Sequence, residues 1–143
     1  MAGVGPGADD QINVFEVEGR YLLKHYFEDS DIYGEMKPYY NNQQYRFEIS
    51  DSNIGAVLTF LSQEGFEMIV VDTEDLEEFI VAVRKYRDHP DNIFKESVMQ
   101  RSTKNYHCFL MKDRGAVKSA VKGGGAPFSP MDIENPFRPS SEA

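Results

Sequence analysis

The sequence is poor in cysteine and in long apolar runs, and each shortage excludes a class of protein. Cys108 is the only cysteine among 143 residues, so no disulfide can form within the chain. No apolar run approaches the roughly 18–20 residues that span a bilayer. The first ten residues lack the basic and apolar regions of a secretory signal. Since a lone thiol suits a reducing compartment, we expect a cytoplasmic protein with no membrane partner.

The motifs that mark most catalytic and metal sites are also absent. The sequence has no CxxC, no HxxxH and no GxxxxGK[ST] phosphate loop. His107 and Cys108 are neighbours on a predicted strand, so they point to opposite faces and cannot share a metal or form a nucleophilic pair. Five carboxylates between Asp72 and Glu78 lack the spacing and central glycine of an EF-hand. We predict no metal and no cofactor, and we favour a non-enzymatic protein over an enzyme.

The composition is that of a globular protein. Hydrophobic residues make up 41% of the chain and aromatic residues 13%, which is enough apolar material to build a core. The length fits one domain of common size. We predict a flexible Gly-rich N-terminus at residues 1–10, a single α+β domain at 11–123, and a disordered tail rich in proline and serine at 124–143.

Alternating apolar residues predict strands in the first half of the chain. Two runs flank Glu18-Gly19 and indicate an N-terminal β-hairpin. Residues 28–44 indicate an irregular connection, and residues 45–49 a half-buried strand. The helical spacing of Ile54, Val57, Leu58 and Leu61 predicts a helix that ends before Gly65. The apolar run at 66–71 then predicts a buried strand.

The second half is less regular. Residues 76–86 fit either a helix or a strand, and we favour a strand at 79–85 because the run is largely β-branched. Pro90 and the helical spacing that follows it, as far as Arg101, predict a second helix. Residues 106–111 predict the last strand, and Asp113 caps a C-terminal helix. The resulting order β-α-β-β-α-β predicts a ferredoxin-like core with an N-terminal β-hairpin and a C-terminal helix.

Three short segments resemble stretches of small acidic proteins of haloarchaeal type. They are Tyr45-Arg46-Phe47-Glu48, Val70-Val71-Asp72 and Phe109-Leu110-Met111-Lys112-Asp113. The resemblance covers roughly residues 40–120 and implies no catalytic residue.

Charge is distributed unevenly along the chain. The net charge is −9 and the pI is near 4.8. This acidity fits either a surface that meets basic partners or a protein adapted to a salt-rich cytoplasm. One 22-residue stretch departs from it, with six basic residues and only one acid, Asp113, for a net charge of +5. The six residues are Arg101, Lys104, Lys112, Arg114, Lys118 and Lys122. Such clustering indicates a partner of opposite charge.

Two partner classes follow from these residues. We predict a non-enzymatic binding or regulatory module that engages an acidic macromolecular partner through the basic C-terminal helix. The tail adds three apolar docking candidates, namely Phe128, Ile133 and Phe137. The alternative is a nucleic-acid-binding protein that combines the basic stretch with sheet aromatics, for which the candidates are Tyr45, Phe47, Tyr106 and Phe109. The same charges are also explained by an ordinary solvated surface, on which the basic residues pair with the protein's own carboxylates. Whether the six residues converge in space therefore distinguishes a binding site from such a surface.

Overall fold

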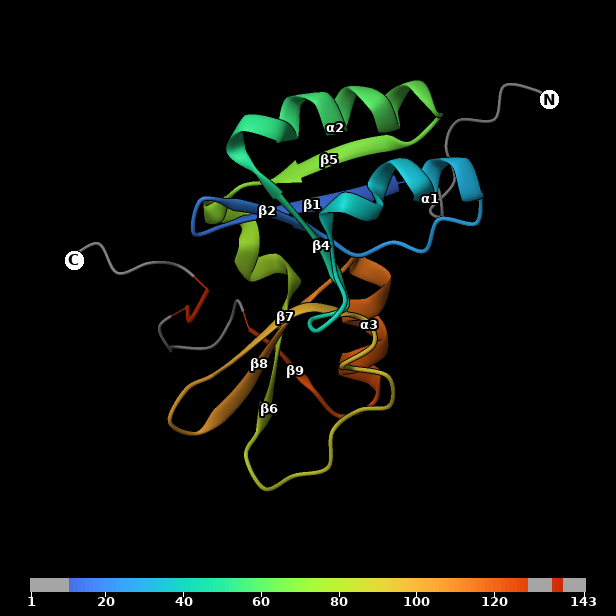
Figure 1. Ribbon diagram of the computed structural model, residues 1–143. Coiled ribbons are helices and arrows are strands. Elements are labelled where there is room, and N and C mark those ends of the chain that lie inside the picture. Colours follow the sequence, from blue (N-terminus) through green and yellow to red (C-terminus); the bar gives the residue numbers. More distant parts are fainter. Residues whose placement is uncertain (1–10, 129–134, 138–143) are drawn as a thin grey trace. The chain divides into compact units, whose positions relative to one another are not determined.

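A computed structural model describes residues 11–128 and 135–137 (Figure 1). The chain divides into two compact units, at residues 1–71 and 72–143, and each unit has its own sheet. The protein is therefore mixed α+β. Across the described residues, no helix combines the length and apolarity required to cross a membrane.

The first unit contains a five-stranded sheet with the order β3-β4-β2-β1-β5. Its strands are β1 (Gln11–Val17), β2 (Arg20–Leu23), β3 (Tyr40–Asn41), β4 (Arg46–Ser50) and β5 (Glu67–Val71). β5 is parallel to β1, and the other neighbouring pairs are antiparallel. The predicted hairpin is confirmed. Glu18 and Gly19 both have positive φ, at 53° and 79°, as a tight two-residue turn between twisted strands requires.

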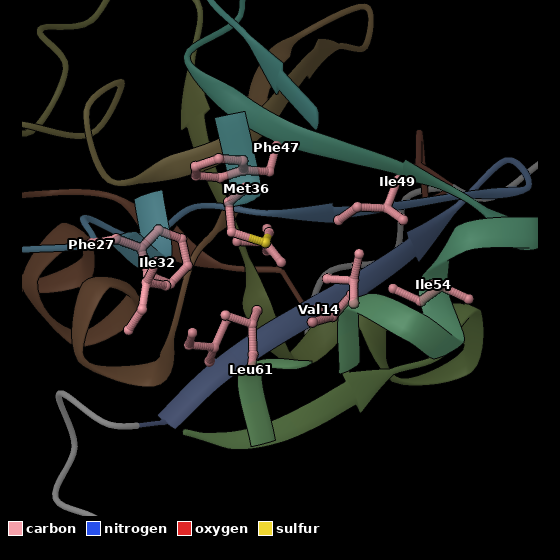
Figure 2. Close-up of a cluster of buried hydrophobic side chains, with 11 residues drawn as sticks. Val14, Phe27, Ile32, Met36, Phe47, Ile49, Ile54 and Leu61 are labelled. Carbon is pink, nitrogen blue, oxygen red and sulfur yellow. The ribbon is translucent and has the colours of Figure 1, made fainter. Parts of the chain in front are cut away.

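Helix α2 (Asp51–Gln63) connects β4 to β5 and was predicted from its apolar spacing (Figure 1). Its buried side chains pack with residues of β1 and β4, and Figure 2 shows Ile54, Leu61, Val14 and Ile49 in this cluster. Gly65 follows the helix with φ of 101°, a conformation that favours glycine. One face of the sheet is thereby buried, which accounts for the alternating pattern of its strands.

Two predictions in the first unit are wrong. Residues 28–44 contain helix α1 (Ser30–Met36) and a 3-10 turn, η2 (Lys37–Tyr39). The Asp29 carboxylate accepts hydrogen bonds from the backbone N–H groups of Asp31 and Ile32, which caps α1. β5 was predicted to be buried, but it forms the edge of the sheet and its Val70 is 45% exposed.

The second unit contains a four-stranded antiparallel sheet with the order β7-β8-β6-β9. Its elements are η3 (Thr73–Phe79), β6 (Ile80–Arg84), β7 (Ser97–Ser102), β8 (Tyr106–Met111), α3 (Arg114–Lys122) and β9 (Ala126–Pro127). The favoured strand at 79–85 is confirmed as β6. The ambiguity over residues 76–86 reflects the short 3-10 turn that immediately precedes this strand.

Helix α3 covers one face of the second sheet. The Asp113 carboxylate accepts a hydrogen bond from the Ala116 N–H at 2.7 Å and caps the helix. Ala116 and Ala120 are buried against side chains of β6 and β8, including Val81 and Phe109. The small alanines let the helix approach the sheet closely, and its basic residues lie on the opposite side.

The ferredoxin-like order is not confirmed. The strands expected in one sheet are divided between two, since β4 and β5 belong to the first unit while β6 and β8 belong to the second. The helix predicted after Pro90 is wrong. Residues 91–96 form turns, and Ser97–Ser102 form β7, which takes its hydrogen bonds from β8. The apolar spacing after Pro90 fits a helix, but pairing with a neighbouring strand determines the conformation of this segment.

The start of the predicted tail is part of the second sheet. Ala126 and Pro127 form β9 beside β6, and the Phe128 N–H donates to the Ile80 carbonyl oxygen at 3.0 Å. Phe128 and Phe137 are both buried. These described residues are ordered, where the sequence predicted a disordered tail from residue 124.

Candidate functional site

The structure divides the six predicted partner-binding residues into two groups, and three of them are engaged within the second unit. The Arg114 guanidinium lies 2.6 Å from the Glu78 carboxylate and 4.9 Å from the centre of the Phe79 ring. Lys112 forms a 2.9 Å ion pair with Glu96. Local carboxylates therefore compensate part of the basic stretch.

Arg101 is also held within the second unit. Its guanidinium donates to the Pro136 carbonyl oxygen at 3.0 Å and lies 6.0 Å from the centre of the Phe137 ring. This contact ties β7 to residues 135–137. We therefore assign Arg101 a structural role in addition to its place beside a cavity described below.

The other three predicted residues are exposed lysines. Lys104 lies in the turn between β7 and β8, and Lys118 and Lys122 lie one helical turn apart on α3. None of the three forms an ion pair within the described part of the chain. Their charges are available to a partner.

Three further basic residues, missed by the sequence analysis, lie near Lys104. Arg84 ends β6, and Lys85 and Arg87 follow it directly. The Lys85 N–H donates to the Asn105 carbonyl oxygen at 3.0 Å, which places this turn beside the β7–β8 turn. The signal was present as the segment Arg84-Lys85-Tyr86-Arg87, a basic run around an aromatic residue.

The end of α3 reaches the same end of the sheet. A Cβ atom added at Gly123 would lie 2.9 Å from the Pro90 side chain, so the helix terminus packs against the segment that follows β6. We call the resulting surface the basic end of the second unit. It comprises Arg84, Lys85, Arg87, Lys104 and Lys122, with Asp88 and Asp91 as the acids of the same segments.

Two tyrosines lie at this basic end. Tyr86 is fully exposed, at 103% relative accessibility, between two cationic residues, and it has a φ of 70°. Tyr106 is half-buried, with the Arg84 guanidinium 5.7 Å from its ring centre. An exposed aromatic ring beside cations is an arrangement found where proteins bind single-stranded nucleic acid.

The aromatic residues proposed for base stacking are mostly unavailable. Phe47 and Phe109 are each at most 2% exposed and belong to the cores of the two units. Tyr45 is 64% exposed but belongs to the first unit, in the turn between β3 and β4. Of the four candidates, only Tyr106 belongs to the basic end.

The two units differ in charge. The first unit has 4 Lys and Arg against 12 Asp and Glu, a net charge of −8. The second has 11 against 12, a net charge of −1. Within the second unit, residues 79–128 carry 10 basic and 4 acidic side chains. The acidity of the chain therefore resides mainly in the first unit, and its densest run of basic residues lies in the second.

A cavity of about 310 Å³ opens on the face of the second sheet that α3 also covers. β7 and β8 contribute Gln100, Arg101, Ser102, His107 and Phe109, and the segment between β6 and β7 contributes His89 and Phe94. The Ser102 hydroxyl and the His107 Nδ1 atom lie 2.8 Å apart. The His89 and His107 rings have their centres 5.5 Å apart. None of the lining residues is acidic.

The acidic segment from Asp72 to Glu78 forms the turn η3. The charge of Asp72, together with some local desolvation and the charges of the neighbouring glutamates, raises the pKa of Asp75 above its ordinary value. Glu78 is engaged by Arg114. No group of three or more histidine, cysteine, aspartate or glutamate side chains is arranged to hold a metal ion within residues 11–128 and 135–137.

The tail docking candidates are placed as follows. Phe128 is 1% exposed and Phe137 is not exposed at all, so neither presents its ring to a partner in this conformation. The Asn135 side chain accepts a hydrogen bond from the Phe137 N–H at 2.9 Å and shapes this short segment. Ile133 lies outside the described residues.

Comparison with known proteins gives no family, because no family model, no curated protein and no solved structure matches the chain. The resemblance to small acidic proteins of haloarchaeal type therefore stays a prediction. The candidate sites rest on the geometry of the second unit alone.

Proposed function

We propose that the protein is a non-enzymatic binding module that engages an acidic macromolecular partner through the basic end of its second unit. The observation that carries this proposal is the grouping of Arg87, Lys104 and Lys122, three exposed cations from three separate elements at one end of a sheet. Clustered positive charge in a chain of net charge −9 attracts a polyanion locally while the rest of the surface repels it. That combination favours binding of the polyanion in one orientation over non-specific binding to the whole surface.

The proposal revises which residues bind. Lys122 remains from the C-terminal helix and Lys104 from the β7–β8 turn, whereas Lys118 lies outside the basic end. Arg101, Lys112 and Arg114 contact groups of the second unit instead. The buried Phe128 and Phe137 argue against docking through the tail.

The test is a binding titration at several salt concentrations, monitored by fluorescence anisotropy. A labelled poly-glutamate peptide and a labelled oligothymidylate serve as the two acidic probes. We expect measurable binding to at least one probe at about 50 mM salt, with an affinity that falls steeply as salt rises, because bound counterions are released on contact. Absence of binding to both probes under these conditions would overturn the proposal.

Nucleic acid is the second candidate partner, and the exposed Tyr86 is the observation that favours it. Base stacking on an aromatic ring contributes roughly 1–3 kcal/mol, whereas an acidic peptide gains little from the same ring. Tyr86→Ala should therefore weaken oligothymidylate binding about tenfold and leave poly-glutamate binding almost unchanged. Tyr26→Ala is the matched control, since Tyr26 is 83% exposed but lies in the first unit.

A further inference from the structure

Strand β5 leaves one side of the first sheet open. It pairs with β1 along its whole length, from Gln11 with Glu67 to Phe15 with Val71, and among the described residues no strand pairs with its other side (Figure 1). The backbone N–H and C=O groups that point away from β1 therefore have no ladder partner in the described part of the chain. Such an edge is a template on which another extended chain can add a strand.

β5 lacks the features that usually protect an edge strand from such pairing. It contains no lysine and no proline, its pairing with β1 runs without a bulge, and its one charge is at its first residue, Glu67. The other four residues are apolar. Val70 is the register partner of Val14, which packs against α2, so Val70 lies on the face that α2 covers, and it is still exposed there. An added strand would therefore gain apolar contact as well as hydrogen bonds.

The charge around β5 has one sign. Residues 47–83, with β5 near the middle, contain nine acidic residues and no lysine or arginine. Glu64, Glu67 and Asp72 lie in the strand or within three residues of it. The four basic residues of the first unit all lie outside β1 and β5. A second copy of this unit, with its net charge of −8, would meet the edge with like charge, whereas a basic segment would meet it with opposite charge.

We propose that the edge of β5 that faces away from β1 binds an extended basic segment of a partner protein by strand addition. Backbone hydrogen bonds to β5 would hold the segment, its apolar side chains would contact Val70, and its basic side chains would lie near Glu67 and Asp72. A segment that alternates apolar and basic residues meets both requirements, since neighbouring side chains of a strand point to opposite faces. The inference goes beyond the proposed function, because that function concerns an acidic partner of the second unit.

The experiment uses the full chain and a fluorescently labelled seven-residue peptide of alternating lysine and valine. We expect saturable binding in anisotropy titrations, with a Kd below about 1 mM at about 50 mM salt. Hydrogen exchange of the ¹⁵N-labelled protein then locates the peptide, because strand addition should slow exchange at the β5 amides that point away from β1 by at least about tenfold. Absence of saturable binding, or unchanged exchange at Glu67–Val71 with the peptide bound, would overturn the proposal.

Two further peptides separate strand pairing from charge. A peptide of alternating lysine and glycine keeps the charge but has a low preference for strand and no apolar side chain, so it should bind at least about tenfold more weakly. A peptide of alternating glutamate and valine keeps the strand preference and reverses the charge, so it should also bind at least about tenfold more weakly. Equal affinity of either peptide would contradict the proposal, since one of its two components would then have no role.

Two variants with the same change in charge test the position of the site. Val70→Lys places a cation on the edge and should weaken the lysine-valine peptide at least about tenfold. Thr59→Lys, at an exposed position on α2, should weaken it by less than about threefold. Equal losses would mean that the peptide responds to the net charge of the first unit and not to β5.

Sedimentation equilibrium of the unmodified protein tests the competing occupant, a second copy of the chain. Because like charges oppose self-pairing at β5, we expect a monomer in the absence of peptide. A dimer that Val70→Lys dissociates would show that β5 pairs with another copy, and it would remove the basic partner from this edge.

Discussion

The Arg114 Nη2 atom lies 2.6 Å from the Glu78 Oε1 atom, and this ion pair joins α3 to the end of η3. It removes one cation from the stripe that the sequence predicted along the C-terminal helix. The pair also compensates one carboxylate of the acidic turn. A charge that is prominent in the sequence is in this way compensated by an ion pair within the protein.

The Arg114–Glu78 pair predicts a variant with little effect. Arg114→Gln should lower the free energy of unfolding by less than about 1 kcal/mol, because both side chains are substantially exposed and water screens their attraction. It should also leave polyanion binding within about twofold of the unmodified protein. Urea denaturation and the anisotropy titration measure the two quantities. A tenfold loss of binding would return Arg114 to the binding surface.

The buried phenylalanines of the C-terminal segment predict a large loss of stability. Phe128→Ala and Phe137→Ala should each lower the free energy of unfolding by about 3–5 kcal/mol, as truncation of a fully buried aromatic ring does. Urea denaturation measures the change, with Phe94→Ala at an exposed position as the control. A loss below about 1 kcal/mol at both positions would mean that these rings are free to leave the core.

Cys108 predicts low thiol reactivity. Burial raises the pKa of its thiol from 9.0 to about 11, so at pH 8 the thiolate fraction falls by about 100-fold relative to an ordinary cysteine. Labelling of the native protein by iodoacetamide should be slower than labelling in urea by at least this factor. Native and denatured rates within tenfold of each other would contradict the burial of this residue.

The same pKa shift makes the free energy of unfolding depend on pH. The unfolded chain loses the Cys108 proton near pH 9 and the folded protein near pH 11. The thiol therefore contributes stability that is fully present below about pH 9 and is lost as the pH rises toward 11. Cys108→Ala should flatten this part of the stability profile, as measured by urea denaturation between pH 8 and about 10.5. An alkaline profile that is identical in the two proteins would contradict the shift.

Two glycines predict opposite effects of one substitution. A Cβ atom at Gly125 would lie 2.5 Å from the Val81 side chain and 3.1 Å from the Ala120 carbonyl oxygen, so Gly125→Ala should cost about 1–3 kcal/mol. Gly55 lies within α2 and has open space around its Cβ position. Gly55→Ala should therefore stabilise by about 0.5–1 kcal/mol, since alanine favours helix. Thermal denaturation of the two variants shows whether each substitution lowers or raises the stability of the protein.

The sequence predicted elements with a strong local signal. The period of α2 and the Glu18-Gly19 turn are set by neighbouring residues, and both are found where expected. β7 was missed because its hydrogen-bond partners lie in β8, and the spacing of Ile93, Ser97 and Val98 fits a helix by coincidence. The first sheet depends on the pairing of β1 with β5, whose register partners lie 56 residues apart, and no local pattern records this pairing.

The candidate site was only partly predictable for a similar reason. The stretch from Arg101 to Lys122 is contiguous in sequence, but ion pairs and a carbonyl contact engage three of its six cations. Arg84 and Arg87 are separated from Lys104 by an intervening loop and a strand. The pairing of β6 with β8, which the Lys85–Asn105 hydrogen bond extends, brings them to one end of the sheet. The clustering of charge in the sequence pointed to the second unit, and it overlaps only in part with the exposed cations of that unit.

The basic end is tested most directly by comparing two triple variants of equal charge. One variant combines Arg87→Gln, Lys104→Gln and Lys122→Gln, which removes three exposed cations of the basic end. The matched control combines Arg20→Gln, Lys37→Gln and Lys95→Gln, which removes three exposed cations from other segments. The measurement is the affinity for the better of the two labelled polyanions, with the slope of its logarithm against the logarithm of salt concentration.

We expect the basic-end variant to lose at least about tenfold in affinity and to show a shallower salt slope, because fewer counterions are released on binding. The control should lose less than about threefold, which reports the change in net charge alone. Equal losses in the two variants would contradict the account, since the polyanion would then respond to the total charge of the chain and not to the surface formed by Arg87, Lys104 and Lys122.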